Sequence, residues 1–104
     1  MTTGVNRLQL DGEVLGAVEA RITPAGIPIH RFTLAHESSQ TEAGMPREAR
    51  CHIAVVASGE ALAPQVKGLA EGDRVRIEGV ITRSSFRDES YRIVLHAQAV
   101  EILR

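Results

Sequence analysis

The sequence predicts an all-β domain: a closed barrel of five strands with one short helix between the third and fourth strands. Apolar and polar residues alternate in several stretches, which is the period of a strand with one buried face. The connections between these stretches are short and rich in Gly and Pro, and only one stretch has apolar residues at helical spacing. At 104 residues, the chain has room for a single domain, residues 1–104, with one core.

The first strand is predicted at residues 6–20, where the apolar residues from Leu8 to Val14 share one phase. Gly12 and Gly16 are natural points for this strand to bend. A helix that begins at residue 12 is the competing interpretation, and two glycines so close together disfavour it.

A turn follows at residues 23–28, TPAGIP, because its proline fixes φ and its glycine allows a positive φ. The second strand is predicted at residues 29–38, with Phe32 and Leu34 on the core phase. His36 lies on the same phase, so we expect a hydrogen-bonded histidine rather than a ligand or a catalyst.

Residues 39–46 are predicted to form a loop, punctuated by a glycine and a proline. The third strand, residues 47–59, is nearly continuously apolar from residue 51 to residue 57. Such a run is typical of a strand that is buried on both faces or lies across a barrel. Cys51 is expected to be a small buried hydrophobe.

The helical candidate is the segment 60–70, EALAPQVKGLA, for which we expect one or two turns with Pro64 in the first turn. The fourth strand is predicted within residues 72–83, GDRVRIEGVITR, where apolar and charged residues alternate. Gly79 falls on its buried phase, where a missing side chain lets the strand bend or a neighbour approach closely.

An arginine-bearing loop, residues 83–90, leads to the last strand at residues 91–103. The apolar phase of this strand changes near residues 97–98, which indicates a β-bulge. Five strands with a helix between the third and fourth match the five-stranded OB-fold barrel. An SH3-like barrel or a small sandwich fits less well, because neither usually places a helix there.

The predicted core consists of the apolar-phase residues of all five strands: Leu8, Leu10, Phe32, Leu34, Ile53, Val55, Val75, Ile77, Ile81 and Leu95.

Composition excludes several functions. The net charge is −1, so any site for a polyanion must be local rather than spread over the surface. The single cysteine rules out an intrachain disulfide and fits the reducing cytoplasm. No apolar run is long enough for a signal peptide or a membrane span, so we expect a cytoplasmic protein without membrane contact.

No catalytic or metal-binding constellation is visible, and we expect neither an enzyme nor a protein with a cofactor or a small-molecule substrate. Cys51 and His52 are adjacent on a strand and point to opposite faces, so they cannot form a nucleophile–base pair. The four histidines lack the spacing of metal ligands, and no phosphate-binding GxxxxGK[ST] motif is present.

The chain resembles the primosomal replication protein N (PriB) family, small bacterial relatives of the single-stranded-DNA-binding proteins (SSB). The resemblance is carried by the segments NRLQLDGEV (6–14), TPAGIPIHRFTLAHES (23–38), EAGMPREARCHIAVVASG (42–59), VRIEGVITR (75–83) and IVLHAQAVEIL (93–103). The pattern GIP…F.L.HES with EAG…C…V.ASG is specific to this family. The resemblance implies a homodimer of OB folds that binds single-stranded DNA and helps the PriA helicase, with other primosome proteins, to reload the replisome at stalled forks.

The resemblance also bears on the DNA-binding residues. Met45 and Arg50 stand where family members often carry an aromatic residue and a tryptophan. Arg87 and Arg92 match two family lysines, and Ser85 replaces a third. OB barrels bind oligonucleotides across the face of strands two and three, flanked by loops. We therefore predict a DNA surface on the two arginine-bearing loops: Met45, Arg47, Arg50, Arg83, Phe86, Arg87, Tyr91 and Arg92.

Two function classes stay open at this point. The first is a single-stranded-DNA-binding restart factor, which the arginine-bearing loops and the resemblance favour. The second is a protein adaptor that docks a helicase or SSB with only weak DNA binding, which the net charge and the scarcity of aromatic residues favour. In either case we expect a homodimer, with the first strand, residues 6–14, as its contact.

Overall fold

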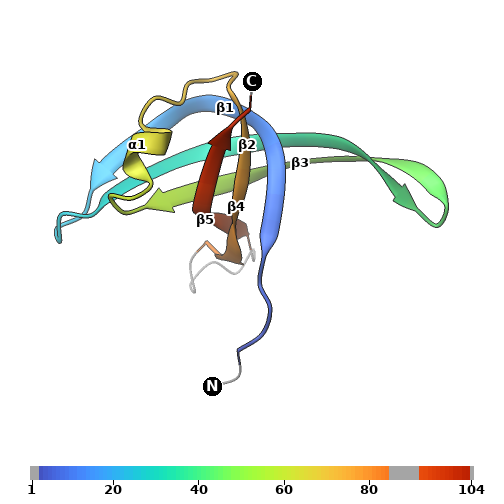
Figure 1. Ribbon diagram of the computed structural model, residues 1–104, viewed down its shortest axis with the longest axis horizontal. Helices are drawn as coiled ribbons and strands as arrows, with labels where there is room; N and C mark the ends of the chain where they lie inside the picture. Colours follow the sequence, from blue (N-terminus) through green and yellow to red (C-terminus); the bar gives the residue numbers. More distant parts are fainter. Residues whose placement is uncertain (1–2, 85–91, 104) are drawn as a thin grey trace.

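The five strands close into a barrel, as predicted, and a short helix follows the third strand (Figure 1). This computed structural model describes residues 3–84 and 92–103. Around the barrel the strand order is β1-β2-β3-β5-β4. The elements are β1 (Leu8–Ile22), β2 (Pro28–Glu42), β3 (Met45–Ser58), α1 (Ala63–Val66), β4 (Arg74–Arg83) and β5 (Ile93–Ile102).

Strand β1 closes the barrel because it pairs with two neighbouring strands, β4 and β2. Its first half, Leu8 to Glu13, pairs with β4, and its second half, from Glu13 onward, pairs with β2. The bend lies at the predicted glycines. A Cβ at Gly12 would lie 2.6 Å from the carbonyl oxygen of Ala35, and Gly16 has a φ of 76° next to a register shift in the β1–β2 ladder.

The β4–β5 pair contains the predicted close approach and the predicted bulge. At Gly79, a side chain would collide with the backbone carbonyl of His96. Immediately beside it the register shifts, because Glu78 pairs with Ala99 and Gly79 pairs with Ala97. Gln98 is therefore the extra residue of a bulge, and both sequence predictions for this hairpin are confirmed.

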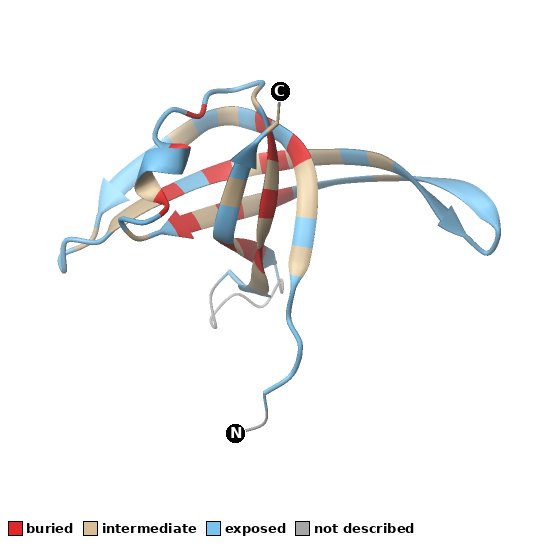
Figure 2. Cartoon of the chain, viewed as in Figure 1, coloured by how far each residue is buried: buried red, intermediate tan, exposed pale blue. Residues whose placement is uncertain are grey.

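Most of the predicted core residues are buried, and Figure 2 marks the buried positions along the strands of the barrel. Seven of the ten predicted core residues are buried, and Leu8, Leu10 and Ile81 are half-buried and pack against them. The core also includes residues that the prediction left out: Val14, Ala57, Leu62, Val66, Leu69 and Ala97. Leu62, Val66 and Leu69 belong to the short helix and its flanks, so this segment covers one end of the barrel.

The predicted loop at residues 39–46 is wrong. These residues continue β2 and β3 into a long hairpin that extends away from the barrel (Figure 1). Its two-residue turn consists of Ala43 and Gly44, both with positive φ (53° and 75°), as in the turns whose twist matches a hairpin. Every residue from 39 to 48 is exposed, so the strands there carry no apolar alternation to mark them. We call residues 37–50 the arm.

The third strand differs from its prediction in burial. Its inner phase is buried at Ile53, Val55 and Ala57, whereas Ala54 and Val56 are half-buried on the outer phase. Cys51 is exposed, so the prediction of a buried hydrophobe is wrong. It lies at the base of the arm, before β3 enters the barrel.

Candidate nucleic-acid interface

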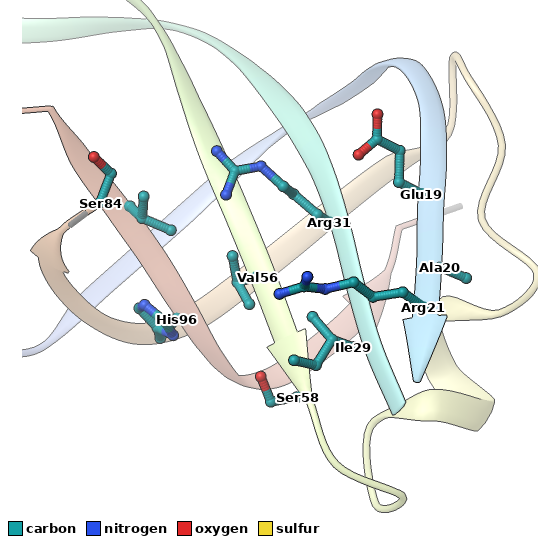
Figure 3. A pocket seen from close by; sticks show the side chains of 10 residues that line it. Glu19, Ala20, Arg21, Ile29, Arg31, Val56, Ser58, Ser84 and His96 are labelled. Atoms are coloured by element: carbon teal, nitrogen blue, oxygen red, sulfur yellow. The ribbon is translucent and has the colours of Figure 1, made fainter. Parts of the chain in front are cut away.

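The outer face of the barrel carries a hollow of about 570 Å³ that crosses four strands (Figure 3). We call it the groove. Its lining comes from β1, β2, β3 and β5 and from the residue that follows β4: Glu19, Ala20, Arg21, Ile29, Arg31, Val56, Ser58, Ser84, Val94 and His96. The groove thus lies on the strand-two and strand-three face that OB barrels use for oligonucleotides.

Strand register explains why these side chains meet. Glu19 pairs with Arg31, Arg31 with Val56, and Val56 with His96, which gives one continuous row from β1 to β5. A second, shorter row runs beside it, from Arg21 through Ile29 to Ser58. Since side chains alternate between faces, the residues between these rows on β2 and β3, His30 and Ala57, are buried on the inner side of the sheet.

The floor of the groove is largely aliphatic. Ile29 and Val56 are half-buried on the outer phase of their strands. Val94 also lines the groove and is only 3% exposed. Such a floor can hold the apolar faces of bases, and among the described residues no Phe, Tyr or Trp lines it.

Two cations of the groove have no partner in the part of the chain that the structure describes. The side chains of Arg21 and Arg31 are exposed, and neither makes a hydrogen bond or an ion pair within residues 3–84 and 92–103. Figure 3 shows both side chains extending across the sheet in the direction of β3. Glu19 lines the same hollow, so these three residues together carry a charge of +1. Both guanidinium groups are available to a ligand.

The arm has the opposite character. Arg50 donates hydrogen bonds to Glu48 at 2.6 and 2.9 Å and to Glu37 at 3.3 Å, and Arg47 forms an ion pair with Glu42 at 3.2 Å. With three glutamates and two arginines, residues 37–50 carry a net charge of −1. Exposed ion pairs of this kind are weak, about 0–1 kcal/mol each. They nevertheless place a carboxylate where a phosphate would bind.

The structure separates the predicted DNA-binding residues into two groups. Arg83 ends β4 and Arg92 precedes β5, and the backbone N–H of Ser84 donates to the carbonyl of Arg92 at 2.8 Å. Ser84 lines the groove, so the backbone of these two arginines lies next to it, although neither arginine is among the lining residues. The other described members lie on the arm: Met45, Arg47 and Arg50. At about 3.3 Å per residue along β3, Arg47 is up to about 30 Å from the groove residue Val56. Phe86, Arg87 and Tyr91 fall outside the described residues.

Arg21, Arg31 and His96 are the groove residues that sequence reasoning missed. They lie on the outer phase of their strands, where charged side chains usually face solvent without a function. They could have been found by combining two facts. OB barrels bind oligonucleotides on the face of strands two and three, and the outer-phase residues of those strands form that face.

Nothing in the described residues indicates metal chemistry or a membrane span. No group of three or more His, Cys, Asp or Glu side chains in residues 3–84 and 92–103 is arranged to hold a metal ion. Within the same residues, the one helix is far too short to cross a bilayer.

Comparisons with known proteins agree with this geometry. Residues 6–99 match the model of a family described as another single-strand binding protein family. Replication restart protein PriB of Proteus mirabilis is 37% identical over 98 residues, which cover 94% of this chain and 93% of the relative. Replication restart protein PriB of Photorhabdus laumondii is 39% identical over 103 residues, with coverage of 99% and 96%. A solved structure of PriB from Ralstonia solanacearum superposes with a TM-score of 0.81 at 26% identity, covering 97% of this chain and 100% of that one.

Proposed function

Because this chain belongs to the replication restart protein PriB family of single-strand binding proteins, we propose that it is a non-catalytic, cytoplasmic factor that binds single-stranded DNA in the groove and aids the PriA helicase at stalled forks. The observation that supports this site best is the continuous row of side chains from β1 to β5. Together with the shorter row beside it, that row joins two arginines that have no partner among the described residues to an aliphatic floor on the binding face of an OB barrel.

The groove combines the two contacts that a single strand needs. Cations hold the phosphate backbone, and apolar or planar side chains hold the bases. In this arrangement the DNA strand runs across β5, β3, β2 and β1, with bases over Ile29 and Val56 and phosphates near Arg83 and Arg92, the two arginines beside Ser84. The net charge of −1 makes such local concentration of cations necessary.

The proposal includes a homodimer formed through β1. Residues Leu8 to Gly12 pair with β4 along one edge, whereas the ladder with β2 begins only at Glu13. The other edge of residues 8–12 therefore has no strand partner within the described chain. A second copy can pair with this edge antiparallel about a two-fold axis, which satisfies its backbone groups and brings two grooves into one particle.

Sedimentation tests the dimer directly. The chain mass is 11.3 kDa, so monomer and dimer differ twofold in mass and are easily resolved. We expect the dimer at micromolar concentration. A single monomeric species at that concentration would refute the β1 interface.

A protein adaptor remains the second candidate, and the arm favours it. An exposed hairpin with paired charges and a net charge of −1 is poorly suited to a polyanion. Its open strand edges and alternating charges suit a protein partner, such as a helicase or SSB, better.

Titration with a fluorescent single-stranded oligonucleotide separates the two functions. Replacing Arg21 and Arg31 together by Ala should weaken binding at least tenfold. Replacing Arg47 and Arg50 together by Ala is the matched control, because it also removes two exposed cations, and it should have a smaller effect. If neither wild type nor variants bind the oligonucleotide at low salt, the adaptor function stands instead.

A further inference from the structure

We infer that Arg21 and Arg31 bind bases through the planes of their guanidinium groups, in place of the aromatic side chains that single-strand binders use. This inference rests on the proposed function, since it names the residues that contact the bases in the same groove. It concerns how the site works, and it yields a different expectation for lysine than for alanine at these positions.

The chain has few flat side chains to offer. Its sequence contains two Phe, one Tyr and no Trp. Phe32 is 3% exposed and packs in the core, so it cannot reach a base. Phe86 and Tyr91 fall outside the described residues. Within the groove, the imidazole of His96 is the one ring among the described lining residues, and it lies on β5 at the far end of the long row from β1.

At the β1–β2 side, planar groups come only from arginine among the described lining residues. Arg21 pairs across the ladder with Ile29, and Arg31 pairs with Val56, so each arginine has an aliphatic neighbour on the same face. In Figure 3 both guanidinium groups reach over this floor. A guanidinium is planar and weakly hydrated, and it stacks on flat π-systems. One face can rest on the floor while a base covers the other.

Comparison with two other arginines shows that the guanidinium groups of Arg21 and Arg31 can stack on bases. Arg50 and Arg76 spend their N–H groups on carboxylates, with donor–acceptor distances of 2.6 to 3.3 Å. Such in-plane hydrogen bonding fixes the guanidinium for a structural role. Arg21 and Arg31 have no such partner among the described residues and keep both their faces and their edges for a ligand.

Charge alone would make the groove a weak site. Arg21, Arg31 and Glu19 sum to +1, and a single neutralised phosphate gives a slope of only about −0.7 in log affinity against log salt. Base stacking on a planar side chain contributes much more per base. The short-range planar contact therefore has to supply most of the affinity at this end of the groove.

The test compares lysine with alanine on two ligands. The double variants are Arg21→Lys with Arg31→Lys, and Arg21→Ala with Arg31→Ala. The ligands are a fluorescent thymidine oligonucleotide and an oligonucleotide of equal length that carries abasic sites throughout, so that both have the same phosphates. Arg74→Lys is the matched control, because Arg74 is exposed, lies outside the groove and has no ion pair among the described residues. Circular dichroism checks that each variant is folded.

For the lysine variant we expect about tenfold weaker binding of the thymidine oligonucleotide, with unchanged binding of the abasic one and an unchanged salt slope. The alanine variant should weaken both ligands, and Arg74→Lys should change neither.

Three outcomes would overturn the inference. Wild-type affinity of the lysine variant for both ligands would show that the arginines act as point charges. Equal weakening for both ligands would show bidentate phosphate contacts. Equal wild-type affinity for the two ligands would show that the groove contacts no bases. Absence of any wild-type binding would instead refute the proposed function itself.

Discussion

Arg76 donates two hydrogen bonds to the carboxylate of Asp11, from Nε to Oδ1 at 2.7 Å and from Nη2 to Oδ2 at 2.9 Å. The two residues are direct neighbours in the β1–β4 ladder. This pair therefore joins the strands that close the barrel, at a β1 residue whose other edge has no strand partner among the described residues. The hydrogen bonds and the positive charge of Arg76 lower the pKa of the Asp11 carboxyl below its ordinary value.

The first prediction concerns the pH dependence of this pair. A lowered pKa means that the folded state binds the Asp11 proton less tightly than the unfolded state does. The stabilisation by the pair is thus complete above the ordinary carboxyl pKa of about 3.9 and is lost as the pH falls through the lower folded value. Asp11→Asn should lower the melting temperature slightly at pH 7, because both side chains are more than a third exposed and well solvated. At a pH below the lowered pKa of Asp11, the two proteins should melt together. A difference that persists there would assign the loss to packing and not to charge.

The second prediction tests the core phase of β4. Ile77 is fully buried, and truncation to Ala should lower the free energy of unfolding by about 3 kcal/mol. Ile102 on β5 is 44% exposed, so Ile102→Ala is a matched control with an expected loss of at most about 1 kcal/mol. Urea unfolding of both variants gives the comparison. Equal losses would contradict the burial difference on which the fold description depends.

The barrel could be predicted because its local rules agree with one another. The strands that contain Phe32 and Ile77 alternate apolar and polar residues with a period of two, and a one-residue slip in register would expose both side chains. The bulge at Gln98 was visible because a bulge must shift the apolar phase of a strand. Such signals exist wherever one face of a strand is buried.

The arm and the groove could not be predicted, for the same physical reason. Residues 39–48 face water on both sides, so hydrogen bonds alone define the strands and no apolar pattern marks them. Arg21 and Arg31 lie on an outer phase, where a charge is expected whether or not a ligand binds. Only the register that places Arg31 between Glu19 and Val56 shows that these side chains share one surface.

The third prediction concerns the turn of the arm. Ala43 has a φ of 53°, a left-handed conformation that costs an ordinary residue about 1–2 kcal/mol. Asn tolerates this conformation, and Asn-Gly is the preferred sequence of a two-residue hairpin turn. Amide hydrogens of the arm exchange when the arm opens locally, and a more stable turn makes such opening rarer. Ala43→Asn should therefore slow amide hydrogen exchange across residues 37–50 severalfold. Ala43→Val should speed exchange in the same residues. Equal exchange in both variants would contradict the left-handed turn.

The last prediction concerns the arginine-bearing loop before β5 and its share of the electrostatics. If each protomer neutralises about three phosphates, log affinity for single-stranded DNA should fall against log salt with a slope of about −2. Replacing Arg87 and Arg92 together by Ala should weaken binding to all sequences alike and flatten the slope by up to about 1.4. The comparison variant is Arg47→Ala with Arg50→Ala, whose cations already have carboxylate partners at 2.6 to 3.3 Å. Arginines that are already paired with carboxylates release few counterions from DNA on binding. Removing Arg47 and Arg50 should therefore change the salt slope less than removing Arg87 and Arg92 does. A larger change for the arm pair than for the pair Arg87 and Arg92 would move the phosphate path onto the arm. An unchanged slope in both would leave the adaptor function as the better account.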